Sequence, residues 1–338
     1  MRFSKRQLVV AISILFIVLA SFFIFSKQKE LADIPFDVGT KAYRDFWINR
    51  VSSVGAHDAY EEFKHINALS DAGSQHLASH VIGNVLYEKE GANGVTVCDA
   101  SFGFGCFHGF FGVALASEGV SAIKELDEAC VDRFGELGTG CTHGIGHGIL
   151  EYYGHERIHD ALAICDDTTQ LVSILGCTSG VFMEYNTPLF ETEDGGLVTL
   201  PREFDSLNAY GPCGSVSEKY KQSCYFELGS WWELSLGKDW EKMEALCSAL
   251  SNTENFKFCM LGVGHTIGNR VNYEVSEIGD ACDAMGRDQR LYCRAGAHWM
   301  LYSNPDYRES APELCEVFDE PQQSVCLKEG RPDLWPQL

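Results

Sequence analysis

The sequence predicts an all-α protein made of disulfide-stapled helix-turn-helix repeats that form an α-solenoid behind an N-terminal transmembrane helix. Three observations predict this class. Fourteen cysteines fall into consecutive pairs, apolar residues recur at helical spacing before several of these pairs, and a long uncharged run lies near the N-terminus.

The cysteines define the repeat. All of them lie beyond residue 97, and successive pairs begin about 34 residues apart, which is typical of a helical repeat array. An even number of cysteines in an exported chain favours disulfides over free thiols. We therefore expect seven structural disulfides between neighbours in sequence: Cys98 and Cys106, Cys130 and Cys141, Cys165 and Cys177, Cys213 and Cys224, Cys247 and Cys259, Cys282 and Cys293, Cys315 and Cys326.

Each repeat is expected to contain two helices. Segments such as "AIKELDEAC" and "WEKMEALC" predict a helix that ends at the first cysteine. Segments such as "CFHGFFGVAL" and "CTHGIGHGIL" predict a second helix that begins near the second cysteine. The upstream segment "SQHLASHVIGNVLYEKEG" fits the second helix with Ser74 in place of cysteine, so we expect seven to eight copies.

The N-terminus predicts a membrane anchor. Positive charges in "MRFSKR" precede an uncharged run from Leu8 to Phe25, long enough to span a bilayer. We favour an uncleaved signal anchor over a cleaved signal peptide, with the repeat domain outside the cytoplasm, periplasmic or extracellular. The expected organisation is a cytoplasmic N-terminus (1–7), a transmembrane signal anchor (8–25), a stalk and first helix (26–58), the α-helical repeat domain (59–330) and a C-terminal tail (331–338).

The net charge limits the classes of partner that the chain can bind. The chain has 26 basic and 48 acidic residues, for a net charge of -22. Such an acidic chain repels nucleic acid, so no nucleic-acid partner is expected. We expect the membrane to be contacted through the N-terminal helix, and a protein or envelope ligand to bind the concave face of the repeats.

The spacing of cysteines and helices resembles the cysteine-rich Sel1-like repeat proteins, which are related to the tetratricopeptide family. The segment "CDASFGFGC" is the most similar to the short cysteine-closed loop of that family, and the similarity in organisation covers roughly residues 60 to 330. This resemblance implies the fold and an interaction-type role. It implies no catalytic residues.

Histidines recur at fixed positions of the second helix. His108 and His143 stand two residues after the second cysteine, His147 stands six after it, and His76 and His80 match these positions in the upstream copy. Histidines at i and i+4 share one helix face and can meet one metal ion. These five residues are the candidate ligands of a transition metal such as Zn, Cu or Fe. If they do not bind a metal, no cofactor is expected.

The alternative is that the histidines only pack between repeats, because Ser179, Phe226, Leu261 and Ala295 occupy the second position elsewhere. Direct acid–base catalysis is a third interpretation. The segments "FHGFFGVAL" and "THGIGHGIL" also resemble the inner helices of lanthionine-cyclase-like α/α toroids, which are zinc enzymes. The sequence leaves open whether the chain is an enzyme. A binding or scaffold module is the first hypothesis, and a metal-dependent enzyme with a histidine-lined site is the alternative.

One insertion interrupts the repeats between Cys177 and Cys213. It contains acidic residues, a Gly-Gly turn and two prolines, so we expect a surface loop. Trp231 and Trp232 follow it, and we interpret them as core residues in preference to a ligand platform.

Overall fold

The computed structural model describes residues 37–135, 139–169, 174–193, 196–304, 307–328 and 330. The chain divides into two compact units, residues 1–37 and 38–338, and the second is described here. The predicted anchor at 8–25 and the tail at 331–338 lie outside the described residues, so both stay predictions. Within the described residues no single helix has the length and apolar character to cross a membrane; a pair of helices, Gly105–Glu118 and Val120–Phe134, bent by 115°, meets those criteria only jointly.

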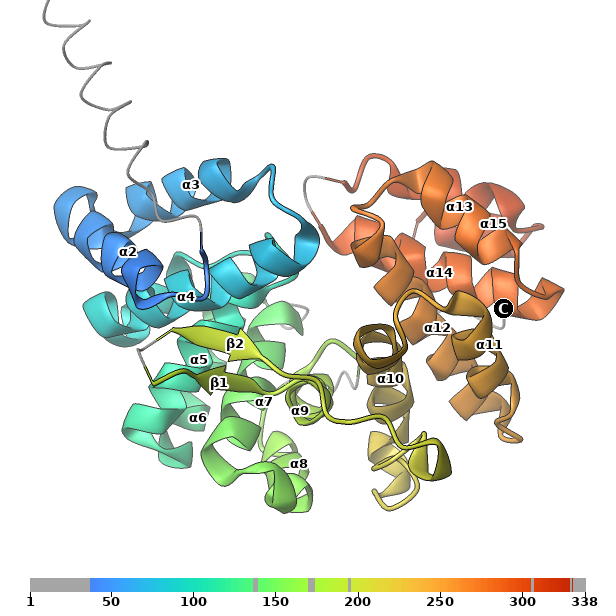
Figure 1. The fold of residues 1–338 in the computed structure, drawn as a ribbon, viewed down its shortest axis with the longest axis horizontal. Coiled ribbons are helices and arrows are strands. Elements are labelled where there is room, and N and C mark those ends of the chain that lie inside the picture. Colours follow the sequence, from blue (N-terminus) through green and yellow to red (C-terminus); the bar gives the residue numbers. More distant parts are fainter. Residues whose placement is uncertain are drawn as a thin grey trace, which may run out of the picture. The chain divides into compact units, whose positions relative to one another are not determined.

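The described residues are mostly helical (Figure 1). The α-helices are α2 (Lys41–Val54), α3 (Ala56–Asn67), α4 (Ala72–Glu90), α5 (Gly105–Glu118), α6 (Ile123–Phe134), α7 (Thr139–Tyr153), α8 (Ile158–Cys165), α9 (Cys177–Asn186), α10 (Lys221–Leu236), α11 (Trp240–Ser248), α12 (Thr253–Arg270), α13 (Val275–Asp283), α14 (Arg287–Ser303) and α15 (Gln322–Cys326). Short 3-10 helices are η1 (Gly91–Thr96), η2 (Val120–Ala122), η3 (His155–Arg157), η4 (Ser206–Asn208), η5 (Glu218–Tyr220) and η6 (Ala311–Val317).

The second helices of the repeats pack against one another in chain order. Helices α4, α5, α7, α9, α10, α12 and α14 each contact the next, as their colours from blue to orange allow the reader to follow in Figure 1. The more peripheral helices α6, α8, α11 and α13 each pack on the second helix of their own repeat. Helix α12 also contacts α4, which brings distant repeats together. The predicted helical repeat is confirmed.

All seven expected disulfides are present, and no cysteine is free. The paired Cα atoms lie 5.5 to 5.8 Å apart. The helix boundaries vary more than the sequence predicted. Cys98 follows the 3-10 helix η1, Cys315 lies in the 3-10 helix η6, and Cys213 lies in a turn after the insertion. The expected α-helix before the first cysteine is therefore replaced in the first, fourth and seventh pairs.

The insertion corrects the all-α prediction locally. It contains an antiparallel hairpin of β1 (Leu189–Glu191) and β2 (Leu197–Thr199), in which Phe190 pairs with Val198. Apolar and β-branched residues on both sides of a glycine turn favour a hairpin over a helix. The hairpin also docks on the chain just before α2, because the amide of Leu197 donates to the carbonyl of Gly39 at 3.0 Å.

The two tryptophans after the insertion are core residues, as the sequence predicted. Both are fully buried. Their indole N–H groups hold the inserted chain: Trp231 donates to the carbonyl of Arg202 at 2.7 Å, and Trp232 donates to the carbonyl of Ala209 at 3.1 Å. The guanidinium of Arg202 stacks over the Trp231 ring, 3.1 Å from its centroid. The two buried indoles thus serve the docking of the insertion, and neither is available at the surface as a ligand platform.

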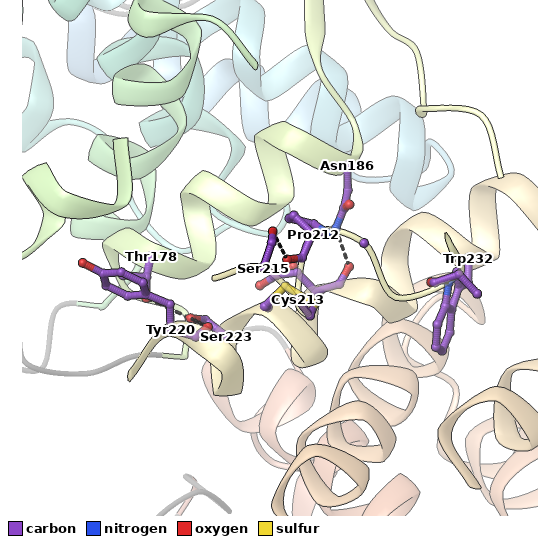
Figure 2. The surroundings of a disulfide bond; sticks show 12 residues. Thr178, Asn186, Pro212, Cys213, Ser215, Tyr220, Ser223 and Trp232 are labelled. Carbon is purple, nitrogen blue, oxygen red and sulfur yellow. Dashed lines mark hydrogen bonds between the residues drawn. A yellow bond between two sulfur atoms is a disulfide. The ribbon is translucent and has the colours of Figure 1, made fainter. Parts of the chain in front are cut away.

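The fourth disulfide shows how neighbouring repeats meet (Figure 2). Close to the Cys213–Cys224 bond, the hydroxyl oxygens of Thr178 in α9 and Ser223 in α10 lie 3.0 Å apart. The Ser223 hydroxyl also lies 3.1 Å from the carbonyl of Tyr220. The polar ends of α9 and α10 therefore satisfy one another at the disulfide-closed turn.

Candidate metal centre

The five predicted histidines come from three neighbouring helices and form one cluster. His76 and His80 lie on α4, His108 lies on α5, and His143 and His147 lie on α7. Four of them are at most 4% exposed, and His76 is partly buried. The i and i+4 spacing places each pair of one helix on one face, as the sequence predicted.

Glycines allow the three helices to approach closely. A Cβ atom on Gly109 of α5 would lie 2.0 Å from the carbonyl oxygen of His80 on α4. A Cβ on Gly144 of α7 would lie 2.8 Å from the carbonyl oxygen of Phe107 on α5. Only glycine fits such contacts, and the backbones approach more closely than the ~10 Å spacing of ordinary helix pairs. Side chains as short as histidine can therefore meet between adjacent repeats.

The first set of ring nitrogens combines α4 with α5. The Nε2 atoms of His76 and His80 are 3.1 Å apart, and His80 Nε2 is 3.3 Å from His108 Nδ1. Two nitrogens bound to one tetrahedral zinc ion at ~2.0–2.1 Å lie about 3.3 Å apart. The spacing of the three donors thus suits one metal ion. The His76 Nδ1 atom lies 2.9 Å from the carbonyl oxygen of Phe102, which holds its proton on Nδ1 and directs Nε2 to the cluster.

The second set combines α7 with α5. The Nε2 atoms of His143 and His147 are 3.3 Å apart, and a nitrogen of His108 lies within 4.8 Å of both. His108 therefore belongs to both sets. Its Nε2 atom is buried and has no hydrogen-bonding partner among the described residues. A buried polar atom without a partner is costly unless a ligand occupies it.

Glu184 orients the second set from outside. Its Oε2 atom lies 3.1 Å from His147 Nδ1, and its Oε1 atom accepts a hydrogen bond from the amide of Leu189 at 3.2 Å. Carboxylates commonly bind the outer nitrogen of a metal-ligating histidine, which fixes the ring and the tautomer. This partner leaves His147 Nε2 available to the cluster.

Burial keeps the cluster uncharged. Desolvation lowers the pKa of His76 to about 4 and that of His147 to about 3, and it holds the pKa values of His80, His108 and His143 well below their ordinary range. Burial raises the pKa of Glu184 to about 7. Neutral imidazoles are the form that binds metal, so the folded chain presents its nitrogens in the ligating state at neutral pH.

The other histidines lie outside the cluster. His265 of α12 lines the same cavity as the cluster histidines, although it belongs to a distant repeat. His298 lies near Cys315 and Cys326, but these cysteines share a disulfide and offer no thiolate to a metal. His57 and His159 are exposed.

No family model, no curated protein and no solved structure matches the chain.

A cavity of about 410 Å³ adjoins the cluster. Its walls include four cluster histidines, and the helices α9, α10, α12 and α14 contribute further side chains. The insertion contributes Thr187 and Thr199. The cluster is thus accessible to a small molecule from the side that α10 and α12 face.

Two carboxyl groups near the site escaped the sequence prediction. Glu227 follows Cys224 by three residues, inside the window of positions two to six that carries histidines in the earlier repeats, and Glu184 follows Cys177 by seven, one residue past that window. The repeat position was therefore an available signal for Glu227 but not for Glu184. Glu227 is buried, accepts a hydrogen bond from the Ser179 hydroxyl and lines the cavity, and burial raises its pKa to about 8.

Proposed function

We propose that this chain is a membrane-anchored, extracytoplasmic helical repeat protein that binds a transition metal ion through its five-histidine cluster. The fold relationship we propose is to the Sel1-like repeats, and the role is that of a binding module. Neutral nitrogen donors suit Zn²⁺, Cu²⁺ or Ni²⁺ and disfavour Mg²⁺ and Ca²⁺, which prefer oxygen. Zn²⁺ best suits a tetrahedral arrangement of imidazoles.

One observation carries the metal proposal. The nitrogens of His76, His80 and His108 have the 3.1 and 3.3 Å spacing of donors around one ion, and His143 and His147 repeat it at 3.3 Å. A purely structural cluster would satisfy each ring with a separate hydrogen-bonding partner. Instead, the rings converge on one another, and His108 Nε2 has no such partner in the described part of the chain.

The packing interpretation is the competing one. It accounts for the exchange of histidine for Phe226 or Leu261 at the second position of α10 and α12. It does not account for ring nitrogens that converge on one another, because a histidine that only packs would hold its hydrogen bonds to separate partners, and His108 Nε2 has none in the described part of the chain.

The deciding experiment is metal analysis of the full-length chain purified in detergent. We expect bound zinc after dialysis, and we expect His108→Ala to remove it, because this residue contributes to both sets of donors. Elemental analysis measures the metal, and circular dichroism checks that the helices persist. His159→Ala is the matched control, because this exposed histidine lies outside the cluster. A wild-type chain without metal, or loss of metal only when the variant unfolds, would contradict the proposal.

The anchor is tested separately. A reporter fused after residue 338 is expected to be active only outside the cytoplasm, and the mature chain is expected to stay with the membrane. The seven disulfides favour that compartment. A soluble product that begins near Ser26 would indicate a cleaved signal peptide instead.

The cavity favours a second candidate, a metal-dependent enzyme. A metal ion at the cluster would supply Lewis acid chemistry. Glu227, in the opposite wall, holds a proton at neutral pH because burial raises its pKa to about 8, so it can donate toward the cavity. Hydrolysis of p-nitrophenyl acetate tests this candidate. An enzyme would show zinc-dependent turnover that falls in Glu227→Gln without loss of metal.

A further inference from the structure

The cavity next to the histidines is too large to serve the metal alone. Its volume of about 410 Å³ is within the ~300–1,000 Å³ of small-molecule sites. A water molecule needs only about 30 Å³. The space therefore suits an organic ligand beside a bound ion.

The net charge of the site indicates whether that ligand carries a positive or a negative charge. Histidine ligands are neutral, so they offset neither of the two positive charges of a divalent ion. Glu184 can offset one of these charges through its hydrogen bond with His147.

The basic Arg270 in the cavity wall is already paired with Glu233 at 2.8 Å. The charge of Arg270 is therefore offset. Asp71 also lines the cavity, but its carboxylate is exposed to solvent and accepts hydrogen bonds from the amide and hydroxyl of Ser74, so it does not balance the ion at the buried histidines. The buried part of the site retains about one uncompensated positive charge. Buried charge of this kind is costly unless an anion balances it.

The side chains of the opposite wall indicate the chemical character of the rest of the ligand. Phe226 and Leu234 lie eight residues apart on α10, so the same helix face runs for about 12 Å along the cavity. Met183 of α9 and Met300 of α14 extend this apolar surface. A doubly charged inorganic anion such as phosphate would find few cationic donors here, because Arg270 is the sole arginine or lysine among the described lining residues.

We propose that the cavity binds a small organic acid, whose carboxylate meets the metal side of the site and whose hydrocarbon chain lies along Phe226, Leu234, Met183 and Met300. This inference rests on the proposed metal site. The single negative charge of a carboxylate matches the one uncompensated positive charge. The apolar wall favours binding of a hydrocarbon chain. Each methylene that leaves water raises affinity roughly fourfold.

The test uses the full-length protein loaded with Co²⁺, whose visible spectrum responds to a new oxygen ligand. Acetate, butyrate and hexanoate are titrated, with inorganic phosphate and hexylamine as comparisons. We expect each carboxylate to change the cobalt spectrum and calorimetric affinity to rise at least roughly tenfold from acetate to hexanoate. Phosphate binding as tightly as hexanoate, hexylamine binding as well, or an unchanged spectrum in the metal-loaded protein would each overturn the inference.

A pair of matched variants tests the apolar wall. Leu234→Glu places a charge where the hydrocarbon chain would lie, and Leu207→Glu makes the same change at a leucine outside the cavity. Both leucines are exposed, 42% and 96%, so both variants should fold. We expect Leu234→Glu to weaken hexanoate roughly tenfold and acetate less than about twofold, and Leu207→Glu to change neither. Equal effects of the two variants would overturn the proposed path of the chain.

Metal content separates the two proposals. A protein that takes up no Co²⁺ or Zn²⁺ contradicts the metal site and the organic-acid site together. A protein that binds metal but does not bind carboxylates contradicts the organic-acid site alone.

Discussion

The early and late repeats share one backbone arrangement but differ in what they place at its centre. Gly109 of α5 approaches the carbonyl of His80, and Gly262 of α12 approaches the carbonyl of Phe226, with hypothetical Cβ distances of 2.0 and 1.9 Å. The second position after the cysteine is His108 or His143 in the early repeats, but Phe226 or Leu261 in the late ones. The glycine contact is thus common to both regions, whereas histidine at the second position belongs to the early repeats alone among those compared.

This difference distinguishes the residues that hold the repeats together from those that form the candidate site. A feature present in both regions serves the stacking of repeats, because stacking is what both regions do. A feature confined to the early repeats must serve something else, and the convergence of its nitrogens indicates a ligand. The late repeats instead supply apolar and carboxyl side chains to the same cavity, so the two regions contribute complementary walls.

Acid should distinguish the two regions most strongly in the metal-free protein. Burial lowers the pKa values of the five cluster histidines in the fold, so below about pH 6.5 the unfolded chain binds protons that the folded chain does not. Stability is therefore present above about pH 6.5 and is lost as pH falls, by about 1.4 kcal/mol per pH unit for each histidine.

Glu151 of α7 and Glu184 oppose this trend, because burial raises the pKa of each to about 7 and the folded chain then binds extra protons between about pH 4.5 and 7. Three of the five protons are not offset. The late helices α12 and α14 carry two histidines with a lowered pKa, His265 and His298. Hydrogen exchange at pH 7 and pH 5, corrected for intrinsic rates, should show α4, α5 and α7 losing protection before α12 and α14. Earlier loss in the late repeats would show that the histidines do not control acid stability.

The glycine contacts should matter equally in both regions. Gly109→Ala and Gly262→Ala each place a methyl group against a backbone carbonyl that cannot move independently, so each is expected to destabilise the fold by at least about 3 kcal/mol. Urea unfolding of the two variants provides the measurement. Gly214→Ala is the control, because a Cβ there meets nothing within 4 Å. A large loss in one region only would break the common-scaffold interpretation.

The histidines should matter for metal and little for folding. His143→Leu introduces the residue that Leu261 supplies at the same repeat position. We expect zinc affinity to fall roughly 100-fold or more, since one donor of the second set is lost, while the unfolding midpoint of the metal-free protein changes little. Competition with a chromophoric chelator measures the affinity. A variant that keeps zinc but unfolds readily would favour the packing interpretation.

Glu184 should give the smallest effect. Glu184→Gln keeps the shape of the side chain but removes the charge that supports His147, so zinc affinity is expected to fall roughly 10- to 100-fold. Gln323→Glu, far along the chain in α15, offers a charge change of opposite sign at a site away from the cluster. If Glu184→Gln left affinity unchanged, the carboxylate would have no orienting role.

The sequence predicted the repeats and the gathering of the five histidines better than it predicted local structure. Consecutive cysteine pairing is a local property, so all seven disulfides could be expected from spacing. The i and i+4 histidines could also be placed on one face. The contact of α12 with α4, and with it the place of His265 at the same cavity, depends on curvature summed over several repeats. No short segment encodes that sum.

The hairpin of the insertion and the role of Glu184 were unpredictable for a related reason. The hairpin is bound by a partner distant in sequence, Gly39, and the inserted chain after it is bound by Trp231 and Trp232. Glu184 gains its role only because α9 packs beside α7 and directs the carboxylate to His147. Both features arise from tertiary contacts, and each side chain on its own reads as an ordinary surface or core residue.

Neighbour-only pairing of the cysteines has a consequence for biogenesis. Every bond joins cysteines 8 to 12 residues apart, with no other cysteine between them. A chain that enters an oxidising compartment from its N-terminal side therefore exposes each correct partner before the first cysteine of the next repeat arrives. Vectorial oxidation then yields the native connectivity by order of emergence, and reshuffling by a disulfide isomerase is required only for chains refolded from the fully reduced state.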